Sequence, residues 1–263
     1  HALLSEQNLF TAFVELNWSY WQIGLASLGL LLMVVVAYTS VVAVRKKISY
    51  EVWFYIHITS YLAVLIAIPH QFVFGTDILS QPWLSLFYVG LYLFVFGSIG
   101  WFRVLQPLIQ SRGIKVVEVR PEKNNTTSVY VDGPGLKRIP FEAGQFFMLR
   151  LLTPRLFLQA HPFSVSSSPK ESRLRFTIGS RGDFTSEIPN LRVGTRVVLE
   201  GPYGIFSEKT RTKKRMLMIA AGIGVAPVRS LARGVVSDPG DVTIIYRVND
   251  AKDAALLEEL RDI

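Results

Sequence analysis

Three long apolar runs lie in the first part of the chain, at residues 21–44, 52–74 and 82–102. None of the three runs contains an Asp, Glu, Lys or Arg. A helix needs about 20 apolar residues to cross the hydrocarbon core of a bilayer, so each run is long enough. Three buried helices of a large soluble core are the alternative, but such runs placed so close together are hard to cover with protein. The pattern therefore predicts three transmembrane helices.

Beyond residue 110 the pattern changes to short strands. Apolar or alternating segments are separated by turns that contain Gly and Pro, and this regular spacing predicts a small antiparallel β-barrel over residues 111–210. From residue 216 an apolar strand, a glycine-containing turn, a helix-like stretch and a second apolar strand follow. That order predicts a partial α/β nucleotide-binding domain over residues 211–263. We therefore expect a multi-domain membrane protein, with an α-helical transmembrane bundle over residues 1–110 and these two domains after it.

The composition changes at the same boundary. Of the 263 residues 50% are hydrophobic and 18% are charged, whereas soluble domains carry about 25% charged residues. Four basic and four acidic residues balance within residues 1–110, so the net charge of +8 belongs to the remainder. The chain has no cysteine, which excludes disulfides, thiolate catalysis, cysteine-held iron–sulfur clusters and zinc ribbons within it. Nucleic acid is not an expected partner, because no recognition motif is present.

The basic residues indicate how the predicted spans are oriented. Arg45, Lys46 and Lys47 lie between the first two runs, and short basic loops face the cytoplasm. The loop at residues 75–81 contains Asp77 but no Lys or Arg, so we expect it outside. The third run then returns inward, which places the rest of the chain in the cytoplasm. We expect an integral protein of the cell membrane whose basic inner half contacts anionic lipid headgroups.

Two histidines lie within the second run, where ionisable side chains are uncommon and usually functional. His57 and His70 are 13 residues apart, which separates them by roughly 20 Å along a helix axis. Neutral imidazole is a good axial ligand of haem iron, so the pair fits two haems at different depths. Simple hydrogen bonding to neighbouring helices is an equally open interpretation. On an ideal helix the two rings are out of phase, and Pro69 is placed to introduce a correcting kink.

The glycine-containing turn of the α/β segment extends from Gly222 to Pro227. Glycines at the carboxyl end of a strand let the backbone approach a pyrophosphate at a helix N-terminus. The turn departs from the usual G-x-G-x-x-G pattern, because Pro227 takes the place of the third glycine. A plain strand–helix turn and a nucleotide site are therefore both compatible with this pattern.

Several short motifs occur together in one order along the chain. They are Tyr55-Ile56-His57, Pro69-His70-Gln71, His161-Pro162-Phe163-Ser164, Gly182-Asp183-Phe184-Thr185, Gly201-Pro202-Tyr203-Gly204 and the Gly222–Pro227 turn. Together they resemble the ferric reductase and NADPH oxidase superfamily, in which a ferric-reductase-like transmembrane domain precedes a ferredoxin-reductase-type FAD/NAD(P)-binding domain. The likeness covers nearly the whole chain. The family has six transmembrane helices and this chain begins with His1 rather than Met, so we expect a fragment that holds the last three.

The resemblance implies sites for FAD and for NADPH, with NADH as the other possibility. The residues that it implies for FAD are His161, Pro162, Phe163, Ser164, Gly182, Phe184 and Thr185. The Ser164 hydroxyl would lie near the reactive flavin nitrogen, and Thr185 with nearby backbone N–H groups would hold the pyrophosphate. Gly222, Gly224 and Pro227 would admit the nicotinamide dinucleotide. Arg247 ends the next strand, where a basic residue accommodates a 2′-phosphate; this favours NADPH, with an ordinary solvated arginine as the alternative.

The resemblance also implies that haem b is bound between helices. His1 and His70 would hold the iron of the outer haem, and His57 would hold the inner haem with a partner from outside this chain. An ordinary loop histidine is the alternative interpretation of His1.

The function that the resemblance implies is electron transfer across the membrane. NADPH would reduce FAD in the cytoplasm, and single electrons would pass through the two haems to a small external acceptor, ferric iron or oxygen. No side chain is expected to act as a catalytic acid or nucleophile. Two alternatives stay open: a haem-free, membrane-anchored flavoprotein reductase that donates electrons to a partner protein, and a regulatory membrane protein whose reductase domain does not turn over.

Overall fold

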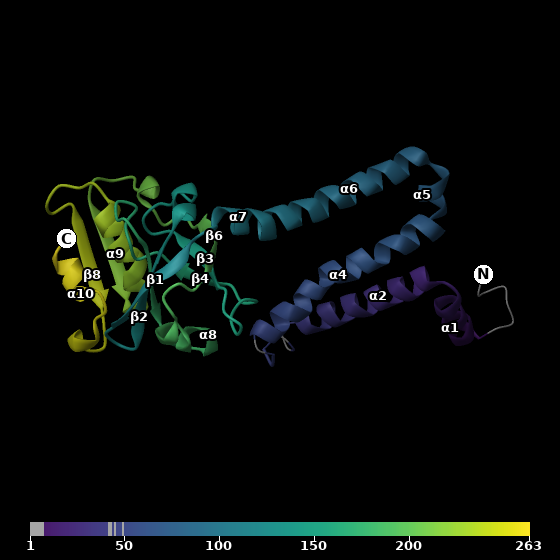
Figure 1. Cartoon of the computed structure of the whole chain (residues 1–263), viewed down its shortest axis with the longest axis horizontal. Coiled ribbons are helices and arrows are strands. Elements are labelled where there is room, and N and C mark those ends of the chain that lie inside the picture. Colours follow the sequence, from purple (N-terminus) through teal and green to yellow (C-terminus); the bar gives the residue numbers. More distant parts are fainter. Residues whose placement is uncertain (1–7, 42–43, 45, 49) are drawn as a thin grey trace. The chain divides into compact units, whose positions relative to one another are not determined.

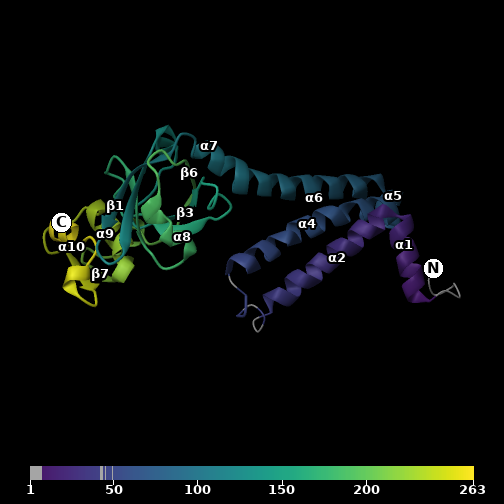
Figure 2. The ribbon, with the colours of Figure 1, turned by 60° about the horizontal axis from the view of Figure 1, so that its bottom comes forward.

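The structure is a computed structural model that describes residues 8–41, 44, 46–48 and 50–263. The chain divides into two compact units between residues 97 and 98. Figures 1 and 2 show the ribbon of each unit from two directions. His1, one of the predicted haem ligands, lies outside the described residues.

Helices make up the first unit where the structure describes it (Figure 1). They are α1 (Leu9–Ser19), α2 (Trp21–Ser40), α4 (Tyr50–Phe74), α5 (Thr76–Ser80) and α6 (Pro82–Gly100). Segments Trp21–Ser40, Val52–Phe74 and Pro82–Gln110 are long and apolar enough to cross a membrane, as the three apolar runs predicted. The third segment extends past residue 102, because a π-helical turn at Trp101–Leu105 and helix α7 (Gln106–Gln110) follow α6.

Helices α2 and α4 lie side by side (Figures 1 and 2). Gly29 of α2 meets the backbone of Ala63 on α4, and a Cβ atom added to Gly29 would come within 2.7 Å of the Ala63 carbonyl oxygen. Ala63 is only 1% exposed. Small residues let helix backbones approach closely in a membrane, where lipid offers no hydrophobic force to drive helices together.

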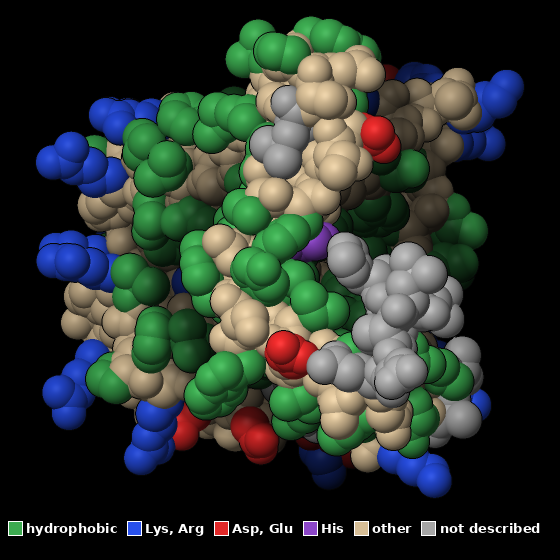
Figure 3. All heavy atoms as spheres, turned by 90° about the vertical axis from the view of Figure 1, so that its right-hand side faces the viewer, with side chains coloured by type: hydrophobic (Ala, Val, Ile, Leu, Met, Phe, Trp, Pro, Cys, Tyr) green, Lys and Arg blue, Asp and Glu red, His purple; other side chains and the backbone are tan. Residues whose placement is uncertain are grey.

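Large apolar side chains cover the outside of these helices. Leu30, Leu86 and Phe94 are 68%, 74% and 72% exposed. Figure 3 looks onto the α1 and α5 end of the unit, where hydrophobic side chains dominate the described surface. Contiguous apolar surface on this scale is costly in water and favourable in hydrocarbon, so it supports the membrane assignment.

Six antiparallel strands follow α7 in the second unit. They are β1 (Lys115–Glu122), β2 (Thr126–Asp132), β3 (Phe146–Leu151), β4 (His161–Ser164), β5 (Leu174–Gly179) and β6 (Val197–Tyr203). One sheet has the order β1-β2-β5 and the other the order β4-β3-β6. The predicted antiparallel β domain is confirmed. Its described strands form two sheets, joined at their edges by single bridges (Lys115–Arg196 and Val165–Phe176), rather than one continuous closed barrel.

The core of this β domain follows from alternation along β3. Phe147, Leu149 and Leu151 are fully buried, while the residues between them face the opposite side of the pleat. The Phe147 ring packs edge-on against Phe176 of β5, with ring centroids 6.2 Å apart. The core therefore connects both sheets and supports β4, which pairs with β3 along its whole length.

A parallel strand pair ends the described chain. Its elements are β7 (Met216–Ala221), α9 (Val225–Gly234), β8 (Val242–Arg247) and the short helix α10 (Leu257–Arg261). Met218 and Ala220 are buried in a cluster with α9, whereas Leu217 and Ile219 are 59% and 68% exposed. The strand–helix–strand order confirms the predicted α/β arrangement, with α9 on one face of the two strands.

Replacing Phe147 by Ala should lower the free energy of unfolding by about 3–5 kcal/mol, because the substitution leaves a cavity in the core where the two sheets meet. Thermal or denaturant unfolding of the detergent-solubilised protein, followed by circular dichroism, measures this loss. Val193→Ala is the control, since Val193 is 67% exposed and should change stability by less than about 0.5 kcal/mol. Equal losses for the two variants would contradict the assigned core.

Candidate functional site

The first two predicted flavin motifs meet around three aromatic rings. His161 and Phe163 come from β4, and Phe184 comes from the short helix α8 (Asp183–Ser186). The Phe184 ring stacks on Phe163 at 5.8 Å and 23°, and its centroid lies 4.3 Å from that of His161. Phe184 is 5% exposed. The fold thus joins two motifs that are separate in the sequence into one aromatic cluster.

The pleat of β4 divides the first motif between two faces. Phe163 lies opposite the buried Phe147 of β3, whereas Pro162 lies opposite Met148. Successive side chains of a strand alternate, so Pro162 and Ser164 share the outer face. Pro162 is exposed and Ser164 is half-buried. The strand therefore presents the Ser164 hydroxyl on the side away from the core.

The second motif forms a turn that its own threonine stabilises. Thr185 Oγ1 accepts hydrogen bonds from the backbone N–H groups of Arg181 at 2.8 Å and Gly182 at 2.9 Å. It also donates to the Gly182 carbonyl at 3.0 Å. These bonds use the proton and both lone pairs of the hydroxyl. In this structure Thr185 shapes the turn, and a direct contact from Thr185 to a pyrophosphate stays a prediction.

The motif Gly201-Pro202-Tyr203-Gly204 lies at the end of β6, where Tyr203 belongs to a small cluster of polar side chains. Tyr203 donates its hydroxyl hydrogen to Glu200 at 2.8 Å, and Arg103 pairs with the same carboxylate at 2.6 Å. Burial, followed by the hydrogen bond to Glu200, raises the pKa of Tyr203 above its ordinary value. The phenol therefore stays protonated at neutral pH and serves as a donor.

The glycine turn lies at the carboxyl end of β7. Gly222 has φ +52°, a left-handed conformation that favours glycine, and α9 begins three residues later. A Cβ atom on Gly222 or Gly224 would meet no protein atom within 4 Å. Pro227 lies in the first turn of α9, where a missing N–H group costs little. The backbone of the turn is thus open to a ligand at a helix N-terminus, as a dinucleotide pyrophosphate requires.

Arg247 lies at the same edge of the strand pair. It is the last residue of β8 and pairs in register with Ala221, the residue before the turn. Arg247 is exposed. Its position agrees with a contact to the ribose end of a dinucleotide. A contact between Arg247 and the 2′-phosphate of NADPH stays a prediction.

The flavin and nucleotide motifs are adjacent in the fold. Ile223, inside the glycine turn, lies against the end of β5, where a Cβ atom on Gly179 would come within 3.9 Å of its side chain. Three residues after Gly179 the second flavin motif begins. The contact between Ile223 and β5 thus brings the nucleotide turn close in the fold to the strand that leads into the second flavin motif.

The two membrane histidines lie on one helix that stays helical through Pro69. His70 donates Nδ1–H to the Ala67 carbonyl at 2.5 Å, which leaves Nε2 as the lone-pair nitrogen that can ligate iron. The His57 ring stacks on Trp53 at 4.9 Å and 23°. Within the described residues no group of three or more His, Asp or Glu side chains forms a metal site. Helix α4 carries the two imidazoles 13 residues apart, and both their ligation of haem iron and the kink at Pro69 stay predictions.

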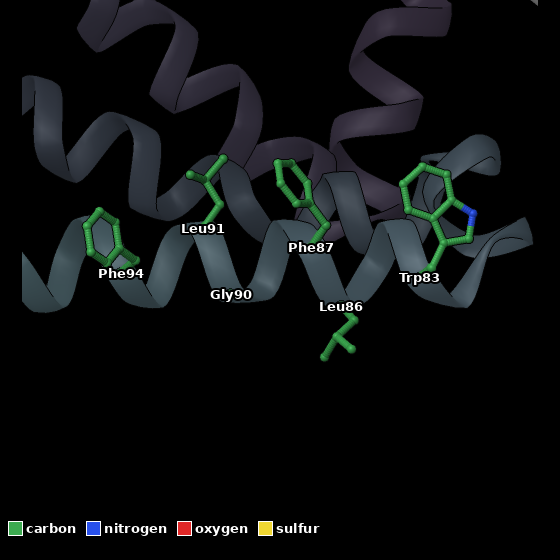
Figure 4. Close-up of a pocket in the computed structure, with 6 residues that line it drawn as sticks. All are labelled: Trp83, Leu86, Phe87, Gly90, Leu91 and Phe94. Carbon is green, nitrogen blue, oxygen red and sulfur yellow. The ribbon is translucent and has the colours of Figure 1, made fainter.

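A shallow hollow lies on the surface of α6 (Figure 4). It is lined by Trp83, Leu86, Phe87, Gly90, Leu91 and Phe94. Its lining has no ionisable side chain, so it suits a lipid chain or a neighbouring helix rather than chemistry.

Sequence reasoning missed a buried set of charges in the second unit. Arg175 of β5 is 2% exposed and Arg229 of α9 is 6% exposed, and both contact Glu259 of α10. The available signal was an arginine inside an otherwise uncharged strand, since long charged side chains are rarely buried without a partner. The partner itself was not predictable, because it lies 84 residues away from Arg175.

Three family models match the chain in succession. "Ferric reductase like transmembrane component" matches residues 2–68, "FAD-binding domain" matches residues 111–207 and "Oxidoreductase NAD-binding domain" matches residues 218–263. The order is the one that the motifs predicted.

Known proteins match the same regions. Respiratory burst oxidase homolog protein B from Arabidopsis thaliana is 24% identical over 217 residues, which cover 71% of this chain and 24% of that protein. A flavohemoprotein from Candida albicans is 27% identical over 157 residues, 57% of this chain and 39% of that protein. Among solved structures, the FAD/NAD-binding domain of nitric oxide dioxygenase from Vibrio cholerae aligns with a TM-score of 0.47 at 21% identity, covering 57% of this chain and 68% of that one.

The chain spans less than half of the length of each of these two curated relatives. It nevertheless carries all three family segments, with candidate membrane helices in the first of them. A ferric-reductase-like transmembrane segment, an FAD-binding segment and an oxidoreductase NAD-binding segment thus follow one another in this single polypeptide, which is the composition of a membrane-associated, flavin-dependent oxidoreductase.

Proposed function

We propose that the protein carries electrons across the cell membrane, from cytosolic NADPH through FAD and two b-type haems to an external acceptor, ferric iron or oxygen. One observation carries the proposal: a single chain combines an apolar helix bearing two imidazoles with a flavin-type unit in which the nucleotide turn contacts the end of a flavin strand. The basic loop at residues 45–47 supports a cytoplasmic location for the flavin and nucleotide segments.

The residues of the second unit hold and orient two flat ligands. FAD, when bound, accepts two electrons as a hydride and releases them singly. Phe163 and Phe184 stack on each other and anchor the two flavin motifs to the apolar core of the β domain. Ser164 presents a hydroxyl from the outer face of the same strand. The open backbone at Gly222 and Gly224 admits the dinucleotide, and the contact of Ile223 with β5 keeps the two sites adjacent.

The residues of α4 supply iron ligands at two depths. Haem iron, when bound, changes its charge by one electron under the control of its axial ligands. The hydrogen bond from His70 to the Ala67 carbonyl selects the tautomer that directs a lone pair to Nε2. Stacking on Trp53 restrains the plane of the His57 ring. The second axial imidazole for each iron must come from another segment, and His1 is our candidate for the iron held by His70.

Replacing His57 or His70 by Ala in the full-length protein should remove about half of the bound haem, and the double variant should remove nearly all of it. The dithionite-reduced absorption spectrum of protein purified from haem-sufficient cells measures the six-coordinate b-type signal. Tyr61→Phe is the matched control, because Tyr61 is an exposed aromatic residue of the same helix. A wild-type protein that purifies without haem would instead support a haem-free flavoprotein that reduces a partner.

Replacing Arg247 by Ala should lower the preference for NADPH over NADH by about tenfold, the loss expected when a charge-assisted contact worth about 1.4 kcal/mol disappears. The ratio of kcat/KM values for flavin reduction by the two nucleotides measures the preference. Arg233→Ala removes one exposed positive charge from α9 and should leave the ratio unchanged. An Arg247→Ala ratio equal to that of the control would eliminate the role assigned to this arginine.

A further inference from the structure

One half-buried carboxylate connects the flavin-type sheets with the nucleotide helix. Both oxygens of Glu259, on α10, accept hydrogen bonds from Arg175 of β5, at 2.8 and 3.0 Å. Glu259 Oε2 also lies 2.8 Å from Nη2 of Arg229 on α9. The two arginine side chains are 2% and 7% exposed, and the glutamate side chain is 30% exposed. This set of three residues is called the Glu259 bridge below.

The charges of the bridge depend on one another. Two buried guanidinium groups cannot lose their protons, so each needs a carboxylate nearby. Glu171 supplies a second negative charge, through an ion pair with Arg229. Burial alone would raise the pKa of Glu259, but the hydrogen bonds and the positive charges of the arginines outweigh burial and lower it. Glu259 is therefore ionised at neutral pH, and the buried charges balance.

The bridge is attached to the segment that continues the flavin strand. Ser166 follows β4 by two residues, and its carbonyl accepts hydrogen bonds from Arg229 Nη1 at 2.9 Å and Arg175 Nη2 at 3.4 Å. Ser230 of α9 adds a donor bond to the Ser167 carbonyl at 2.6 Å and accepts the Gly144 N–H at 3.2 Å. Buried polar bonds thus connect α9 to the peptide that carries the first flavin motif.

We propose that Glu259 is a positioning residue that fixes the distance between the glycine turn of α9 and the flavin motif of β4. The inference rests on the proposed transfer of a hydride from NADPH to FAD. The turn at Gly222–Gly224 contains none of the bridge residues, so we expect its affinity for nucleotide to change little when the bridge is broken. The distance and angle between nicotinamide and flavin do depend on the bridge. A misplacement of about 1 Å is enough to slow a reaction roughly a hundredfold.

The test is Glu259→Gln in the full-length, FAD-loaded protein. Glutamine keeps the size of the side chain but leaves two buried arginines without its negative charge. In stopped-flow reduction by NADPH, the maximum rate of flavin bleaching should fall at least about tenfold, while the NADPH concentration at half-maximal rate changes less than about threefold. FAD content should stay at the wild-type level. Glu259→Asp, which keeps the charge on a shorter side chain, should recover part of the rate.

Glu258→Gln is the matched control. Glu258 precedes Glu259 on the same helix, and its side chain is 68% exposed and pairs only locally with Arg261 among the contacts described for it. This variant should keep the wild-type rate. A normal maximum rate in Glu259→Gln, or a rate loss explained entirely by lost FAD or by weaker NADPH binding, overturns the positioning role.

A neutral variant covers the case in which Glu259→Gln fails to fold. Ser230→Ala removes two of the buried bonds that hold α9 without leaving a charge unpaired, and it should lower the same maximum rate by a smaller factor. An unchanged rate in Ser230→Ala, together with unfolded Glu259→Gln, reduces the bridge to a stability element. Flavin bleaching is measured from the flavin absorbance and does not require haem. If the wild-type protein reduces FAD but never haem, the transmembrane proposal is contradicted, and the test of Glu259 still applies.

Discussion

Buried positive charge requires a partner, and in this protein that requirement determines how the nucleotide helix meets the flavin-type sheets. Arg175 and Arg229 lie beneath the surface on two different elements, and Glu259 contacts both. An apolar contact between the same elements would tolerate sliding, because hydrophobic packing has no direction. Bidentate bonds between a guanidinium group and a carboxylate have a fixed geometry. The polar contacts of Glu259 thus add a directional constraint to the apolar contacts between the same elements.

Local pattern predicted the elements of the fold well. Uninterrupted apolar runs marked the helices that include Trp21–Ser40 and Val52–Phe74, and a continuous apolar strand followed by glycines marked β7 and its turn. These features depend on neighbours in the sequence. The motif at residues 161–164 was recognised by resemblance rather than by local pattern. The resemblance assigned this motif and Phe184 to the same cofactor, but nothing local to β4 indicated that their rings would be in contact.

Long-range pairing was beyond local pattern. The hydroxyl contact between Ser128 and Thr177 links residues 49 positions apart, and no period or turn predicts such a partner. The small antiparallel barrel expected from regular strand spacing is present as two three-stranded sheets, whose edges are joined by the bridges Lys115–Arg196 and Val165–Phe176. The role of Thr185 also depended on geometry, because a hydroxyl that could reach a phosphate is instead bonded within its own turn.

The contact of Gly29 with Ala63 falls almost midway between His57 and His70 on α4. Helix α2 thus supports the part of α4 that sets the vertical spacing of the two imidazoles. A bulkier residue at position 29 would tilt or bow that part while leaving both histidines in place. Substitution of this glycine would therefore change how the two imidazoles lie relative to each other, without removing either of them.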